Sequence, residues 1–191
     1  FQDRSQLKTQ SLRSLVFEPL YEDTGKAAFV GAEAMLRLGD FDLEAEPSLR
    51  QAVDRILKLV EGTEQFARLV QLHELREYYP GLMQVAIEHG DNPTGLAAIR
   101  TLLQNGEAAL IENYLSSNDV KVAVQTAQVL GNSRDPKAFS FLKGALQEET
   151  LSWSVREQAV RSLAGTRGGI EVLVEAAQSG EFPEALREVA G

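Results

Sequence analysis

The sequence predicts an all-α protein, an α-solenoid of stacked antiparallel helical hairpins. Apolar residues recur at spacings of three and four along most of the chain, which is the period of an amphipathic helix. Pairs of such segments follow one another about every 30 residues, as in repeat architectures whose units bury their apolar faces against each other. The segment 131–136, Gly-Asn-Ser-Arg-Asp-Pro, is typical of a tight junction between two helices.

The first part of the chain has the least regular pattern. We predict that residues 1–46 form a helical or irregular segment that packs on the solenoid, and that the repeat array occupies 47–191. The helical pattern in 1–46 is interrupted by Pro19, Gly25, Gly31 and Gly39. Beyond Pro47, apolar stripes predict helices over 49–60, 66–72 and 80–87, the last opened by Pro80.

The second part predicts three hairpins in succession. Their stripes cover 96–103 and 110–115, 120–130 and 138–146, and 155–163 and 170–177. In the middle hairpin we expect Gly131 to end the first helix and Asp135-Pro136 to open the second, with Leu130, Ala127 and Leu142 buried between them.

One further first helix is predicted at the end of the chain. Its apolar positions are Ala185, Leu186, Val189 and Ala190. Because no second helix follows, we expect an array truncated at its C-terminal end, and a chain that is a piece of a longer protein.

Composition excludes several functions. The 19 basic and 28 acidic side chains give a net charge of −9, which repels a phosphate backbone, so we expect no nucleic-acid partner. The absence of cysteine excludes disulfides, thiolate zinc sites and covalent haem attachment. Since no apolar run reaches the roughly 20 residues that cross a bilayer, we expect no membrane insertion. We also expect no cofactor and no bound metal.

Two segments superficially suggest metal sites. His73-Glu74-Leu75-Arg76-Glu77 resembles a zinc-protease helix, but Glu77 stands where the second histidine is needed, so a histidine at the edge of the core is favoured. The alternating acids Asp40, Asp42, Glu44 and Glu46 suggest a calcium loop. Ala45 and Gln51 replace its central glycine and its bidentate glutamate, which favours a solvated acidic turn.

Three other features have competing interpretations. Residues 165–169 are rich in glycine, but no P-loop lysine follows, so we interpret them as a hairpin whose glycines supply unusual backbone angles. Arg134 and Arg167 precede consecutive second helices and either form a basic ladder for an acidic partner or cap carbonyls and pair with nearby acids such as Asp135. Trp153 either anchors a partner or fills the gap between units.

We predict that the second helices of the hairpins line a concave partner-binding face. The candidate contact residues are Gln84, Glu112, Asn113, Ser140, Lys143, Glu171 and Glu175, together with Arg134 and Arg167. Nothing in these positions predicts a catalytic group.

The order Leu130-Gly131, Asp135-Pro136, Ala138 resembles the HEAT-like repeats of the phycobilin-lyase type, which implies an armadillo-like superhelix. The segments 66–70, 75–79 and 87–95 look like the HEAT region of large bacterial proteins, in which it lies between a sugar-dehydrogenase-like β-propeller and a c-type cytochrome domain. That resemblance implies a redox-related parent protein and a periplasmic or secreted location.

The function expected from the sequence is therefore a non-catalytic scaffold or protein-interaction domain, whose partner is a protein or a neighbouring domain of the same polypeptide. An enzyme of the bilin-lyase type and a nucleic-acid-binding solenoid are the alternatives. The sequence leaves the oligomeric state open.

Overall fold

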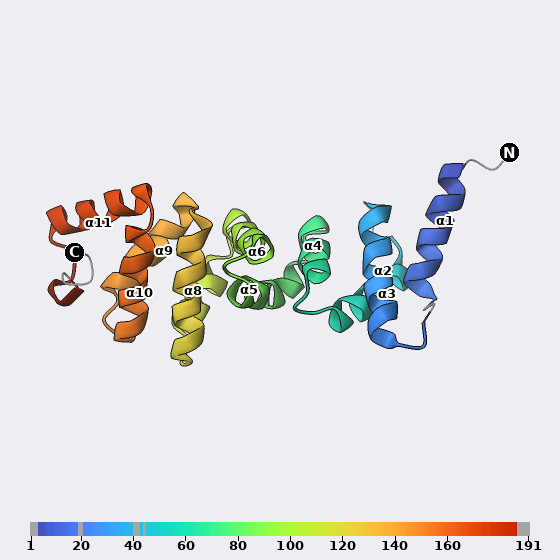
Figure 1. The fold of residues 1–191 in the computed structure, drawn as a ribbon, viewed down its shortest axis with the longest axis horizontal. Helices are drawn as coiled ribbons and strands as arrows, with labels where there is room; N and C mark the ends of the chain where they lie inside the picture. The colour runs from blue at the N-terminus through green and yellow to red at the C-terminus, as the bar shows by residue number, and fades with distance from the viewer. Residues whose placement is uncertain (1–3, 19–20, 40–42, 44, 187–191) are drawn as a thin grey trace. The chain divides into compact units, whose positions relative to one another are not determined.

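The computed structural model describes residues 4–18, 21–39, 43 and 45–186, and the regular elements among them are all helices (Figure 1). The predicted all-α class is confirmed. The α-helices are α1 (Arg4–Phe17), α2 (Thr24–Leu38), α3 (Pro47–Leu59), α4 (Glu64–Leu72), α5 (Tyr79–Glu88), α6 (Pro93–Gln104), α7 (Ala108–Leu115), α8 (Val120–Ser133), α9 (Pro136–Gln147), α10 (Trp153–Ala164) and α11 (Arg167–Ser179). Two 3-10 turns are η1 (Arg76–Tyr78) and η2 (Glu184–Leu186).

The chain divides into two compact units, Phe1–Leu82 and Met83–Gly191. The boundary predicted from the sequence, between an N-terminal segment and the repeat array at 46/47, differs from this division and stays a prediction. The structure joins α1 and α2 to the helices that follow, because α2 packs against both α3 and α4. The amphipathic stripes of 49–60 and 66–72 therefore complete a core with α2.

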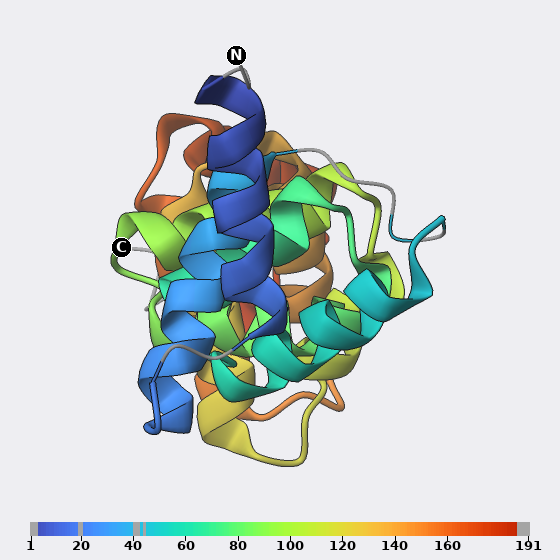
Figure 2. The same cartoon turned by 90° about the vertical axis from the view of Figure 1, so that its right-hand side faces the viewer.

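The N-terminal unit is built around close helix contacts. Figure 2 shows α1 and α2 side by side, in the two darkest blues. A Cβ on Gly31 of α2 would come within 2.8 Å of the Ile56 side chain of α3, so the glycine allows these two helices to approach. Met35 and Leu57 are fully buried in the same core.

A polar cluster in this unit ties α3 to η1. The Asp54 carboxylate accepts hydrogen bonds from the Tyr78 hydroxyl at 2.8 Å and from Arg50 Nε at 3.1 Å, and Arg50 also pairs with Glu77. The Tyr78 ring meets Phe66 edge-to-face, with 6.2 Å between ring centroids. Burial, followed by the hydrogen bond to Asp54, raises the pKa of Tyr78 to about 12.

The C-terminal unit contains the predicted hairpins α6–α7, α8–α9 and α10–α11. The first helix α8 packs against both α6 and α10, as successive repeats of a solenoid do. Leu130, Ala127 and Leu142 have no exposed surface, which confirms their predicted place in the core.

The predicted helix end at Gly131 is wrong. Helix α8 continues to Ser133, and Arg134 caps it with φ 53° and ψ 21°, in the left-handed region. Gly131 lies inside the helix. The residue is a glycine because a Cβ there would come within 2.5 Å of Ser162 in α10. It is thus required by a close approach and not by a turn.

The apolar stripes predict some buried positions that are exposed. Ile170 and Val174 of α11 have 48% and 49% of their surface exposed, because no described element covers that face of the helix. Leu72 and Val120, at helix termini, are also exposed. At the end of the chain, Leu186 is buried in η2, whereas the predicted helix positions Val189 and Ala190 lie outside the described residues.

Candidate interaction groove

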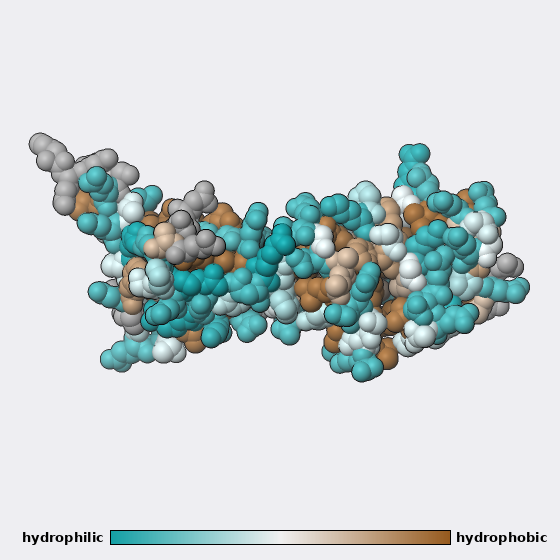
Figure 3. Space-filling model, turned by 180° about the vertical axis from the view of Figure 1, so that it is seen from behind, coloured by the Kyte–Doolittle hydropathy of each residue, from teal (hydrophilic) through white to brown (hydrophobic). Residues whose placement is uncertain are grey.

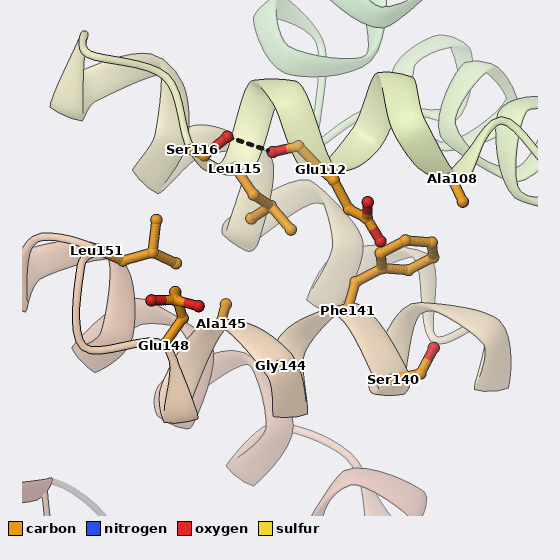
Figure 4. Close-up of a pocket in the computed structure, with 10 residues that line it drawn as sticks. All are labelled: Ala108, Glu112, Leu115, Ser116, Ser140, Phe141, Gly144, Ala145, Glu148 and Leu151. Carbon is orange, nitrogen blue, oxygen red and sulfur yellow. Dashed lines mark hydrogen bonds between the residues drawn. The ribbon is translucent and has the colours of Figure 1, made fainter.

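A groove separates the second helices α7 and α9 of consecutive hairpins (Figure 4). Its volume is about 500 Å³. The apolar part of the lining is formed by Leu115 of α7, Phe141 and Ala145 of α9, and Leu151 in the loop after α9. Leu115 and Ala145 are buried, and Phe141 is partly exposed, so the groove opens onto the core of the unit.

Two carboxylates border the groove. In Figure 4 the Glu112 side chain extends from α7 toward α9, while the Ser116 hydroxyl donates to the Glu112 carbonyl oxygen at 2.8 Å. Glu148 follows α9 and accepts hydrogen bonds from the hydroxyl and the backbone N–H of Thr150, which lower the pKa of its carboxyl group. The groove therefore combines an apolar lining with negative charge at its edge.

Gly144 of α9 faces the open space of this groove. A Cβ built on Gly144 would meet no described atom within 4 Å, so the packing of the chain does not require glycine there. A glycine inside a helix is less stable than alanine by about 0.8–1 kcal/mol. The absence of a side chain at Gly144 thus leaves the groove wider and makes α9 less stable.

The predicted contact face is exposed, but only part of it borders the groove. Glu112 and Ser140 line the groove. Gln84 hydrogen-bonds Tyr114. Lys143 forms an ion pair with Glu181 at 2.8 Å, which raises the pKa of the lysine and lowers that of the glutamate. The remaining predicted contact residues of the second helices are exposed and lie outside the groove lining: Asn113, Glu171 and Glu175.

Three residues of the groove are not among the contact residues predicted from the sequence: Gly144, Phe141 and Leu151. One signal was present: Gly144 stands inside the stripe 138–146 without ending the helix. A glycine of that kind indicates a close approach or an open space, and the sequence does not tell which.

The two candidate arginines lie in different surroundings. Arg167 is almost fully exposed and pairs with Glu171 at 3.4 Å, as one of its two interpretations expected. Arg134 lines a separate cavity together with Arg100 and Arg161, so the structure does not group it with Arg167.

The described residues of the two segments that suggest metal sites, 73–77 and 40–46, do not form a cluster of metal ligands. No group of three or more potential ligands exists among the described residues, which exclude Asp40, Asp42 and Glu44. Helix α4 ends at Leu72, His73 is its partly buried C-cap, and Glu74 has φ 47°. The zinc-helix geometry is therefore absent, because His73 and Glu77 do not share one helix face.

Two further expectations need correction. The glycines of 165–169 do not supply unusual backbone angles. Gly165 has φ −72°, and a Cβ on Gly168 or Gly169 would collide with Phe139 or with the Leu163 carbonyl. Trp153 does not fill the gap between units, because 47% of its surface is exposed.

Apolar side chains reach the surface of the C-terminal unit in the view from behind, as brown areas among teal ones (Figure 3). Among the described residues of this unit, the large exposed apolar ones are Val120, Trp153, Ile170 and Val174. Among the described helices none is long and apolar enough to cross a membrane.

Stacked helical hairpins with a groove between neighbouring second helices define a helical-repeat protein of the α-solenoid class. Residues 107–190 match the protein family described as HEAT repeats. The match starts directly before α7 and runs beyond α11, so it contains the groove and the last two hairpins. No curated protein and no solved structure matches the chain. The HEAT-like resemblance is confirmed for this part of the chain, and the phycobilin-lyase type stays a prediction.

Proposed function

We propose that this chain is a non-catalytic interaction domain that holds a segment of a partner protein, or of a neighbouring domain of its own polypeptide, in the α7–α9 groove. The observation that carries the proposal is Gly144, which faces empty space inside the groove. Glycine at this position weakens α9 and improves no contact among the described residues. It provides room for an occupant.

The lining favours one kind of occupant. Phe141 and Leu151, which are partly exposed, present apolar surface that a bulky apolar side chain of the partner would cover. Glu112 and Glu148 at the border favour a lysine or arginine next to that side chain, because opposite charges at the rim guide association and orient the partner. An amphipathic helical segment with a basic edge meets both requirements.

The composition of the groove supports a binding role without catalysis. Of the ten residues that line it, only Glu112 and Glu148 are titratable. Acid–base catalysis needs groups with different proton affinities that converge on one reacting atom, and both of these groups are glutamates at an open edge. The alternative of a bilin-lyase enzyme has no comparable support from this geometry.

We also propose a wider setting for the domain. It is supported by the resemblance of the segments 66–70, 75–79 and 87–95 to the HEAT region of large bacterial proteins. There the domain is part of a larger, redox-related bacterial protein, in the periplasm or outside the cell, and positions the domains beside it. A parent sequence that places a propeller or a haem-binding motif beside this segment would support this setting.

The experiment uses a synthetic amphipathic helical peptide of leucine and lysine as the probe, and a glutamate-for-lysine analogue. Binding is measured by calorimetry and by the fluorescence of Trp153, the single tryptophan, which lies two positions beyond Leu151. Gly144→Met fills the groove and is expected to weaken binding about tenfold, as loss of a central contact does. Glu112→Lys is expected to weaken binding of the lysine peptide and to favour the glutamate analogue.

The matched control is Gly165→Met. Gly165 follows α10 in the next hairpin and lies outside the lining of the groove, and a Cβ there would make only ordinary contacts at 3.6 Å. Circular dichroism verifies that both methionine variants keep their helices. Equal binding by Gly144→Met and the parent chain would refute the groove as the docking site.

A further inference from the structure

A second cavity lies between the first helices of three successive hairpins. Its volume is about 600 Å³, and it shares no lining residue with the α7–α9 groove. Arginines from all three hairpins line it: Arg100 from α6, Arg134 at the end of α8 and Arg161 from α10. We propose that this cavity binds carboxylate groups of an acidic protein segment, independently of the groove.

The charge of the cavity differs from that of the chain. Its lining contains three arginines and one acid, Asp91, in a chain whose net charge is −9. A local positive potential inside an acidic protein attracts a ligand with one or two negative charges. The surrounding acidic surface repels a dense polyanion such as a nucleic acid.

Arg134 has an unfavourable backbone conformation, and no contact of its side chain within the described residues compensates for it. Its φ of 53° lies in the left-handed region, where glycine or asparagine is the usual helix cap. Within the described residues its guanidinium has no hydrogen-bond or ion-pair partner, and the side chain is exposed. Strained backbone at a position of this kind is often associated with ligand binding.

The other two arginines are already oriented. Arg100 donates from Nε and Nη2 to the Ser133 carbonyl oxygen, at 3.3 and 2.9 Å, and this bond joins α6 to the end of α8. Arg161 donates to Glu157 at 2.7 Å, which partly offsets its charge. Because a guanidinium has five N–H donors, both retain donors for a ligand, and their fixed positions reduce the ordering needed on binding.

The chemistry of the lining favours a protein segment. The planar guanidinium fork matches the two oxygens of a carboxylate. The exposed amide of Gln128 also lines the cavity and has both a donor and an acceptor for a peptide backbone. An aspartate- or glutamate-rich segment therefore fits the cavity better than an isolated anion.

The test titrates the full chain with a synthetic peptide of alternating glutamate and serine, with a glutamine analogue, and with inorganic phosphate. Nuclear magnetic resonance follows the Nε–Hε signals of Arg100, Arg134 and Arg161. We expect these signals to shift with the glutamate peptide alone. Arg134→Gln is expected to weaken binding about tenfold, the usual effect of losing one charged hydrogen bond.

The matched control is Arg167→Gln, which removes the same charge from an exposed arginine outside the cavity. Arg134→Gly, which suits the left-handed conformation, is expected to raise the melting temperature and still weaken peptide binding, so a folding defect cannot explain the loss. Gly144→Met is expected to bind the glutamate peptide normally, which separates this inference from the proposed groove.

Three outcomes would overturn the inference. One is the absence of arginine shifts with the glutamate peptide. Another is an equal loss of affinity in Arg134→Gln and Arg167→Gln, which would indicate only general attraction. The third is tighter binding of inorganic phosphate than of the peptide, which would assign the cavity to a free anion.

Discussion

Gly131 of α8 lies against Ser162 of α10, and a Cβ atom on Gly131 would be only 2.5 Å from the Ser162 Cβ. The Ser162 hydroxyl donates back to the Ala127 carbonyl oxygen of α8 at 2.9 Å. A residue without a side chain and a small hydroxyl residue therefore set the spacing between two successive hairpins.

Gly131→Ala is expected to destabilise the chain by about 1–3 kcal/mol, as overpacking of a close contact does. A loss of stability would be informative, because alanine inside a helix is otherwise more stable than glycine. Urea unfolding of the variant measures the change, and a gain in stability would contradict the close contact.

Gly144→Ala is expected to have the opposite effect. The new methyl group meets no atom within 4 Å, so only the helix preference remains, worth about 0.5–1 kcal/mol in favour of alanine. The same unfolding experiment applies, and a loss of stability would show that the space around Gly144 is already filled.

Leu130→Ala removes a side chain that has no exposed surface. The expected loss is about 2–5 kcal/mol, the usual range for truncating a buried leucine. Val174→Ala, at a residue that is 49% exposed in the same unit, is the control and is expected to change stability little. Similar losses in both variants would refute the assigned core.

Tyr78 is expected to show a late step in an ultraviolet absorbance titration, with its pKa raised to about 12 from an ordinary 10.0. Between these two values the unfolded chain loses the phenolic proton while the folded chain keeps it. Stability from this group is therefore complete below pH 10.0 and declines as the pH rises toward about 12. Tyr78→Phe should remove the late step, and Asp54→Asn should bring it to lower pH. A late step that persists in Tyr78→Phe would belong to another tyrosine.

The spacing of apolar residues predicts the helices and most of the core, because burial of one helix face leaves a local pattern of three and four. Leu130 and Leu142 are examples. The role of Gly131 escapes this reasoning, since glycine marks both turns and close approaches, and Ser162 is far along the chain.

The candidate groove is harder to predict for the same reason. Glu112 and Ser140 could be predicted as surface residues, because they lie on the outward face of the second helices, and both line the groove. The space between α7 and α9 depends on how two hairpins stack, which no short segment encodes. Phe141 and Leu151 acquire their role only from that spacing.

The close contact between α8 and α10 also has a mechanical consequence. Gly131 and Ser162 are in contact and resist compression. Between α7 and α9 there is no comparable close contact at Gly144, where a Cβ would meet no described atom within 4 Å. We therefore expect the hairpins to resist closer approach between α8 and α10, and to yield more readily between α7 and α9, in the direction that closes the groove.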